Sequence, residues 1–164
     1  MTIALREMDR ADVAAVTALE ATANPAPWSF QLFEGELALP STARQWLVAI
    51  DADGAVVGFG GMMYAASTAH LMNLGVSDDH RRRGIGLRLC LALFAEARAR
   101  GAEELTLEVR VSNERAAALY EKLRMTSVGV RPGYYSNGED ASIYWIRDLQ
   151  APEVGRLLDE LEAA

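Results

Sequence analysis

Hydrophobic and polar positions change their spacing several times along the chain. Apolar residues recur at helical spacing from Asp9 to about Ala23 and from Ser29 to about Leu39, and aspartate and serine are both favoured N-caps. Two further helices are predicted over 84–100 and 114–123. Alternating or continuous apolar runs predict strands at 2–6, 45–50, 56–64, 69–76, 105–111, 127–130 and 141–148. This order of elements indicates one mixed α/β sheet with helices packed on it.

Turn-forming residues separate these elements. The DADG sequence at 51–54 predicts a β-hairpin, and Gly101 is typical of a helix C-terminus. Pro25 and Pro27 require a loop between the first two helices. Pro152 begins an amphipathic helix that docks on the domain or on a partner. We therefore divide the chain into a domain over 1–148 and a helical tail over 149–164.

The composition is that of a soluble globular protein. The chain has 164 residues, 51% of them hydrophobic and 24% charged, which fits one domain. No apolar segment is long enough to span a bilayer and the N-terminus does not resemble a signal peptide, so we expect a cytoplasmic protein without membrane contact. The net charge of −7 argues against binding to nucleic acid. With one cysteine, Cys90, and two histidines, no metal site is expected, and a monomer is favoured.

A basic, glycine-containing loop lies between a predicted strand and a long helix. It reads Arg81, Arg82, Arg83, Gly84, Ile85 and Gly86. Glycines allow close approach of the backbone to a ligand, and the helix N-terminus supplies unpaired N–H groups and a positive dipole end. Three arginines beside that positive end repel one another, and a bound polyanion would relieve the repulsion. The alternative is a solvated basic loop, because short glycine motifs are weak evidence.

At these residues the chain resembles the GNAT superfamily of acetyl-CoA-dependent acetyltransferases. The loop matches the family's pyrophosphate pattern Gln/Arg-x-x-Gly-x-Gly/Ala, and the match continues through LEVRVSN at 107–113 and ALYEKL at 118–123. The Pro27-Trp28-Ser29 segment, the two tyrosines Tyr134 and Tyr135, and GEDA at 138–141 resemble the RimI-type branch. That branch acetylates the N-terminal alanine of a ribosomal protein. The resemblance implies a mixed, mostly antiparallel sheet of about seven strands flanked by about four helices, followed by the C-terminal amphipathic helix.

The resemblance also implies a role for each matched residue. Glu108 would be the general base and Tyr120 the general acid. Pro27, Trp28, Tyr134 and Tyr135 would flank the incoming peptide. The residues implied to hold acetyl-CoA are Leu74, Gly75, Val76, Arg81, Arg82, Arg83, Gly84, Ile85, Gly86 and Asn113.

Pattern alone favours plainer roles for several of these side chains. Glu108 fits the polar face of a strand, and Tyr120 fits a packing residue whose hydroxyl lies near the surface. Trp28 fits a core anchor as well as a substrate contact. His70 is interpreted as structural, because no pairing partner is evident in the sequence. Cys90, among leucines, is interpreted as a buried hydrophobe, which favours direct transfer over an acetylated enzyme.

Two departures from the family pattern bear on the site. Arg124 and Met125 replace the usual Gly-Phe after the tyrosine helix, so the helix end and the pose of Tyr120 are expected to differ. Asp79 and His80 stand where proline and an aromatic residue are common, which alters the loop more than the chemistry.

The chemistry of one glutamate and one tyrosine suits an α-amine. The α-amino group has a pKa of roughly 7.7–8.0, whereas lysine at about 10.4 is harder to deprotonate. We therefore predict acetyl transfer to a protein N-terminus, by direct attack through a tetrahedral intermediate with the Val76 N–H as the candidate oxyanion donor. The alternatives are a small-molecule amine acetyltransferase, acting on a polyamine or drug, and a non-catalytic acyl-CoA sensor. Retention of Glu108 and Tyr120 argues against the sensor.

Overall fold

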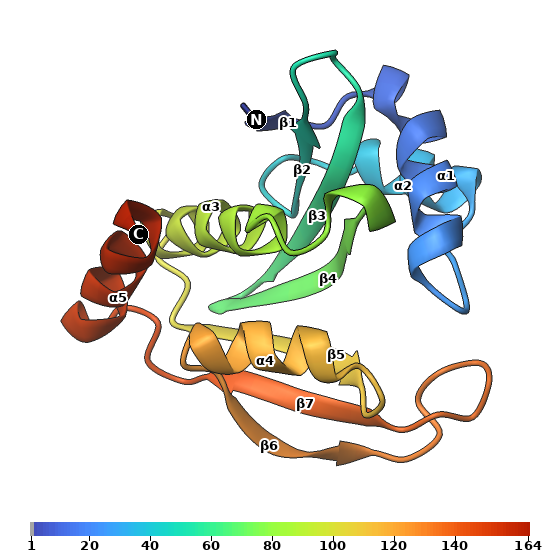
Figure 1. The fold of residues 1–164 in the computed structure, drawn as a ribbon. Helices are drawn as coiled ribbons and strands as arrows, with labels where there is room; N and C mark the ends of the chain where they lie inside the picture. Colours follow the sequence, from blue (N-terminus) through green and yellow to red (C-terminus); the bar gives the residue numbers. More distant parts are fainter. Residues whose placement is uncertain (1) are drawn as a thin grey trace.

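The computed structural model describes residues 2–164 of the chain, which form a seven-stranded sheet with helices on both faces (Figure 1). The strand order is β1-β2-β3-β4-β5-β7-β6, and every neighbouring pair is antiparallel except β4 and β5. The strands are β1 Ala4–Glu7, β2 Arg44–Ile50, β3 Val56–Ala65, β4 Thr68–Val76, β5 Glu104–Arg110, β6 Thr126–Arg131 and β7 Ala141–Ile146. The mixed, mostly antiparallel sheet predicted from the sequence is confirmed.

Five α-helices accompany the sheet. They are α1 Val13–Ala23, α2 Phe30–Leu37, α3 Ile85–Ala99, α4 Glu114–Lys122 and α5 Pro152–Ala163. The Asp9 cap starts a 3-10 turn over Arg10–Asp12, and α1 follows it. The Ser29 hydroxyl caps α2 by accepting from the Leu32 N–H at 3.2 Å. Within residues 2–164, no helix is long and apolar enough to cross a membrane.

Each face of the sheet has its own apolar core. Under α1 and α2, Val16, Phe33 and Phe59 form one cluster of buried side chains. On the opposite face, a larger cluster joins the sheet to α3, α4 and α5, with Leu93 and Leu107 at its centre. The helices therefore cover both faces of the sheet. A ligand can reach the centre of the sheet where two strands separate.

That separation occurs between β4 and β5. The two strands pair only from Thr68 to His70, and a register shift places Met72 as an extra residue of β4 opposite β3. A bulge of this kind bends its strand and increases its local twist. Beyond His70 the strands diverge, as Figure 1 shows, and leave the sheet open at its middle.

The last helix is tied to α3. Arg98 of α3 donates to the Leu149 carbonyl and, at 3.1 Å, to the Ala151 carbonyl just before α5. Leu158 of α5 is buried in the large core cluster. The apolar face of the C-terminal helix thus packs against α3 of the same chain.

The end of α4 keeps a glycine-type geometry without a glycine. Arg124 adopts a left-handed φ of 58°. Its N–H donates to the Glu121 carbonyl at 2.9 Å, and the Met125 N–H donates to the Tyr120 carbonyl at 3.0 Å. This pair of bonds is the Schellman motif. The expected departure at the helix end is therefore not seen in the backbone, and Arg124 adopts the conformation that glycine usually supplies.

Candidate active site

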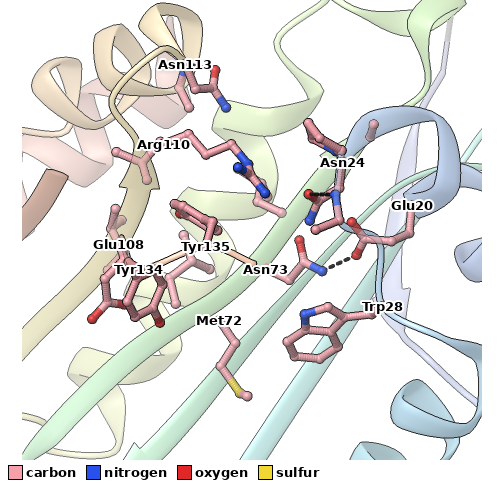
Figure 2. Close-up of a pocket in the computed structure, with 18 of the residues that line it drawn as sticks. Glu20, Asn24, Trp28, Met72, Asn73, Glu108, Arg110, Asn113, Tyr134 and Tyr135 are labelled. Atoms are coloured by element: carbon pink, nitrogen blue, oxygen red, sulfur yellow. Dashed lines mark hydrogen bonds between the residues drawn. The ribbon is translucent and has the colours of Figure 1, made fainter. Parts of the chain in front are cut away.

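A cavity of about 630 Å³ lies where β4 and β5 diverge (Figure 2). Its walls come from both faces of the sheet: Glu20 and Asn24 from α1 and its C-cap, and Ala116 and Tyr120 from α4. The cavity therefore connects the α1 side of the sheet with the α4 side. Such an opening can accommodate two reactants that approach from opposite directions.

The carboxylate of Glu108 lies on the cavity wall with a histidine beside it. Glu108 Oε2 is 2.6 Å from His70 Nε2, and Oε1 is 3.7 Å from Arg131 Nε. The hydrogen bond from His70 is the main reason that the pKa of Glu108 is lowered; burial acts in the opposite direction. The carboxylate is thus ionised and oriented. His70 thus has a partner that the sequence does not reveal, because the β4–β5 register places it against Glu108.

Tyr120 reaches the same cavity from α4. Its side chain is 5% exposed, and burial raises its pKa well above the ordinary value of a tyrosine. The hydroxyl therefore carries its proton at neutral pH and can donate it. The plainer interpretation, with the hydroxyl near the surface, does not match this burial.

The β4 backbone directs N–H groups toward the opening. The Ser77 N–H donates to the Val57 carbonyl of β3 at 2.9 Å. Because bonding direction alternates along a strand, the N–H groups of Leu74 and Val76 point away from β3, toward the opening. Gly75 has a packing reason to be glycine, since a Cβ there would lie 2.5 Å from Phe59 Cε1.

The basic loop forms a second hollow of about 470 Å³. It is lined by four arginines and two aspartates: Arg81, Arg82, Arg83, Arg115, Asp78 and Asp79. Arg82 and Gly84 both have left-handed backbone, with φ of 60° and 76°. Turns of this kind direct successive N–H groups to one side and form anion-binding concavities. Arg115 of α4 was not predicted, because nothing in its local sequence indicates that α4 begins beside this loop.

Asn113 acts at the start of α4, where its Oδ1 accepts from the Ala116 N–H at 3.1 Å. It also lines the large cavity. Asn113 is therefore the N-cap of α4, and its implied part in holding acetyl-CoA stays a prediction.

Aromatic residues from two loops, α1–α2 and β6–β7, line the cavity. Trp28 packs on Phe33 and Trp46, with ring centroids 5.4 and 5.6 Å away, and still lines the cavity. The Tyr134 and Tyr135 rings meet edge to face at 5.0 Å. Both tyrosines line the cavity, whereas Pro27 does not lie among its lining residues.

Arg110 links β5 to the loop between β6 and β7. Its Nη1 donates to Asn137 Oδ1 at 3.0 Å and to Glu139 Oε1 at 3.2 Å, and its guanidinium lies 3.9 Å from the Tyr135 ring centroid. Figure 2 shows the side chain over the middle of the cavity. Within residues 2–164, its buried Nη2 has no hydrogen-bond partner.

A second carboxylate, Glu20, faces the cavity from α1. It is 1% exposed, and the amide of Asn73 donates to it. Burial is the largest influence and raises its pKa. Sequence reasoning missed Glu20, Asn73 and Arg110. For Glu20 and Asn73 the available signal was a polar position within an apolar helix or strand, and for Arg110 it was a place in the LEVRVSN motif.

Residues 13–124 match the acetyltransferase (GNAT) family. The chain therefore belongs to this family, and it is an N-acetyltransferase. Its relatives include the [ribosomal protein bS18]-alanine N-acetyltransferase of Salmonella typhimurium, which is 35% identical over 135 residues, 80% of this chain and 88% of the relative.

Solved structures agree with this assignment. The ribosomal-protein-S18-alanine N-acetyltransferase from Escherichia coli matches with a TM-score of 0.81 and 30% identity, over 93% of this chain and 97% of that one. Arabidopsis thaliana NAA60 in complex with acetyl-CoA shares the fold, with a TM-score of 0.79 and 17% identity over 88% and 98% of the two chains.

Proposed function

We propose that this enzyme transfers the acetyl group of acetyl-CoA to the N-terminal α-amine of a protein, and that the acceptor is a ribosomal protein. The observation that carries the proposal is the cavity through the sheet, with Glu108 and His70 on its wall and Tyr134, Tyr135 and Trp28 around its mouth. The names of the bacterial relatives at 30–35% identity support the ribosomal acceptor.

The described residues fit acetyl-CoA. The arginine-lined hollow and the left-handed turns at Arg82 and Gly84 suit a pyrophosphate, and the Leu74 N–H suits a carbonyl oxygen of the pantetheine arm. The co-substrate supplies an activated acetyl thioester. In this arrangement Arg115 adds a fourth cation to the phosphate-binding loop.

Glu108 receives the proton of the acceptor amine. Its ionised carboxylate first attracts and orients the amine, of which a modest share is neutral at pH 7. The nitrogen becomes much more acidic once it attacks the carbonyl carbon, so a carboxylate with a lowered pKa can accept its proton at that stage. His70 is a positioning residue, since it holds Glu108 at 2.6 Å.

The opposite wall completes the transfer. The attack places negative charge on the thioester oxygen, and the Val76 N–H, which points into the opening, is the candidate donor to it. Tyr120, buried and protonated, donates to the departing sulfur. Cys90 is fully buried, and burial raises its pKa to about 12, so it is unsuited to form an acetylated intermediate.

The test is thiol release from acetyl-CoA with a panel of acceptors. The panel contains peptides that start with Ala, Ser, Gly or Met, the same peptides with blocked N-termini, and several polyamines. We expect turnover only with free N-termini, and the fastest with alanine first. Turnover of polyamines would instead indicate a small-molecule acetyltransferase.

Glu108→Gln tests the assignment of the base. The amide keeps the shape of the side chain and cannot accept a proton, so kcat/KM should fall by roughly 10²- to 10⁴-fold. Binding of CoA, measured by calorimetry, should stay within experimental error of the wild type. If Glu108→Gln combined with Tyr120→Phe left turnover unchanged, both assignments would be wrong. Binding of CoA without turnover of any acceptor by the wild type would favour the acyl-CoA sensor.

A further inference from the structure

The guanidinium of Arg110 is only half satisfied. Nη1 is engaged by Asn137 and Glu139, while the buried Nη2 has no partner within residues 2–164. The residue is 8% exposed and lines the cavity. Burial of a donor without a partner costs free energy. A ligand that brings an acceptor atom to this wall would remove that cost.

Arg110 lies on the same face of β5 as Glu108. Alternate residues of a strand share a face, and two positions span about 6.8 Å. An extended peptide rises by the same amount in two residues. If the acceptor amine lies at Glu108, one of the first two main-chain carbonyls of the acceptor peptide lies at the level of Arg110.

The charges around Arg110 favour a neutral acceptor atom. Glu139 already pairs with its guanidinium, and Glu20 and Glu108 line the same cavity. An acidic side chain of the ligand would be repelled by these carboxylates, whereas a neutral peptide carbonyl would not be. Contact of the guanidinium with the Tyr135 ring, 3.9 Å away, holds its plane beside the cavity mouth.

We propose that Arg110 binds the acceptor peptide, by donating from Nη2 to one of the first two main-chain carbonyls. This inference rests on the proposed function. It adds a basis for substrate choice, because polyamines carry an amine without a neighbouring carbonyl. Arg110 would then distinguish a peptide N-terminus from other amines at the site where Glu108 accepts the proton.

A double-variant cycle tests the contact. One partner of the cycle is Arg110→Met, which keeps much of the side-chain volume without a donor. The other is an alanine-first peptide in which the first or the second peptide bond is replaced by a trans alkene, which has no carbonyl. Any change that the alkene makes to the basicity of the peptide amine is the same for the wild type and Arg110→Met, so it cancels in the cycle.

For the wild type we expect one of the two alkene peptides to lose roughly 10- to 100-fold in kcat/KM, as for a hydrogen bond from a charged donor. Arg110→Met should show less than a threefold preference for the natural peptide. Glu139→Gln is the control: it weakens the Nη1 contact, keeps Nη2, and should retain the wild-type preference. Arg110→Leu, which also has no donor, replaces the methionine variant in the cycle if that variant does not fold.

Equal preferences in the wild type and in Arg110→Met would overturn the contact and would leave the proposed function intact. Loss of the preference in Glu139→Gln as well would assign Arg110 to loop positioning and would also overturn it. Failure of the wild type to acetylate any peptide would overturn the proposed function, and this inference with it.

Discussion

At the scale of single residues, the Glu108 carboxylate is held by a histidine and an arginine from different strands. His70 comes from β4 and Arg131 from β6, and each contacts a different carboxylate oxygen. Together they keep the side chain ionised against the effect of burial. Its ionisation therefore depends on three strands being in register.

Replacement of His70 should move the pH dependence of catalysis. In His70→Leu the hydrogen bond that lowers this pKa most is lost, and burial is opposed only by the smaller influences of Arg131 and a backbone hydrogen bond, so the pKa of Glu108 rises. The acid limb of the kcat/KM profile should then lie at higher pH than in the wild type. The profile is measured with an alanine-first peptide, and His80→Gln serves as the control for the other histidine. An acid limb at the same pH in His70→Leu would show that Glu108 does not govern it.

The same hydrogen bond contributes to folding. The pKa of Glu108 is lower in the folded state than in the unfolded state, so the bond stabilises the fold fully at pH values above the unfolded-state pKa. This contribution to stability is lost as the pH falls through the folded-state pKa.

Residue identity could be predicted from the sequence only where a motif carried it. Glu108 and Tyr120 stand at fixed places in LEVRVSN and ALYEKL, and both line the cavity. His70 stands in no such motif, and Arg110 stands in LEVRVSN without a role implied by the resemblance. Their roles depend on which residues of β4, β5 and the β6–β7 loop lie opposite each other, and a single sequence does not record that register.

At the scale of elements, the end of α4 retains strain that the family pattern avoids. Arg124 has a φ of 58°, where a side chain costs roughly 1–2 kcal/mol and glycine costs little. Arg124→Gly should raise the free energy of unfolding by about 0.5–1 kcal/mol, after the greater freedom of glycine in the unfolded chain is subtracted. Thermal unfolding measures the gain. Arg124→Ala retains a Cβ and should not increase the free energy of unfolding. An increase equal to that of Arg124→Gly would show that the lost charge, and not the relieved strain, is the cause.

The path of β4 depends on the absence of a side chain at Gly75. A Cβ at this position would lie 2.5 Å from the fully buried Phe59 ring, which has little room to move. Gly75→Ala should therefore destabilise the protein by about 1–3 kcal/mol. Gly35→Ala is the matched control, because it lies in α2 with nothing within 4 Å of its Cβ, and should stabilise by up to about 1 kcal/mol. Denaturant unfolding of both variants measures the difference, and equal effects would contradict the packing argument.

Element positions could be predicted to within a few residues, because apolar spacing and caps determine them locally. The separation of β4 from β5 could not be predicted from this spacing. Its local cause, the extra residue Met72, is invisible in the apolar pattern of 69–76 because a bulge changes pairing and leaves composition unchanged.

At the scale of the whole molecule, an acidic protein presents one strongly basic hollow. The net charge is −7, yet four arginines meet at the start of α3 and α4. The surrounding negative potential repels polyanions, so the affinity for CoA should depend on these few side chains and should fall as salt rises.

Arg115→Ala should weaken CoA binding by roughly 3- to 10-fold at low salt, and by less at high salt, because screening reduces the contribution of an exposed cation. Arg156→Ala removes the same charge from the exposed face of α5 and is the control. Calorimetric titration with CoA at two salt concentrations measures both variants. Equal weakening in the two would point to net charge instead of a local contact.

The opening between β4 and β5 has a kinetic consequence. Since the cavity is lined from both the α1 and the α4 side, acceptor and donor can occupy it together, and neither must depart to admit the other. Steady-state rates should then show intersecting patterns, typical of a ternary complex, instead of the parallel lines of a ping-pong cycle. A single molecule that joins CoA to a peptide N-terminus through an acetyl bridge would thread the sheet. It would bind far more tightly than either half, because the second contact forms at the high effective concentration set by the first.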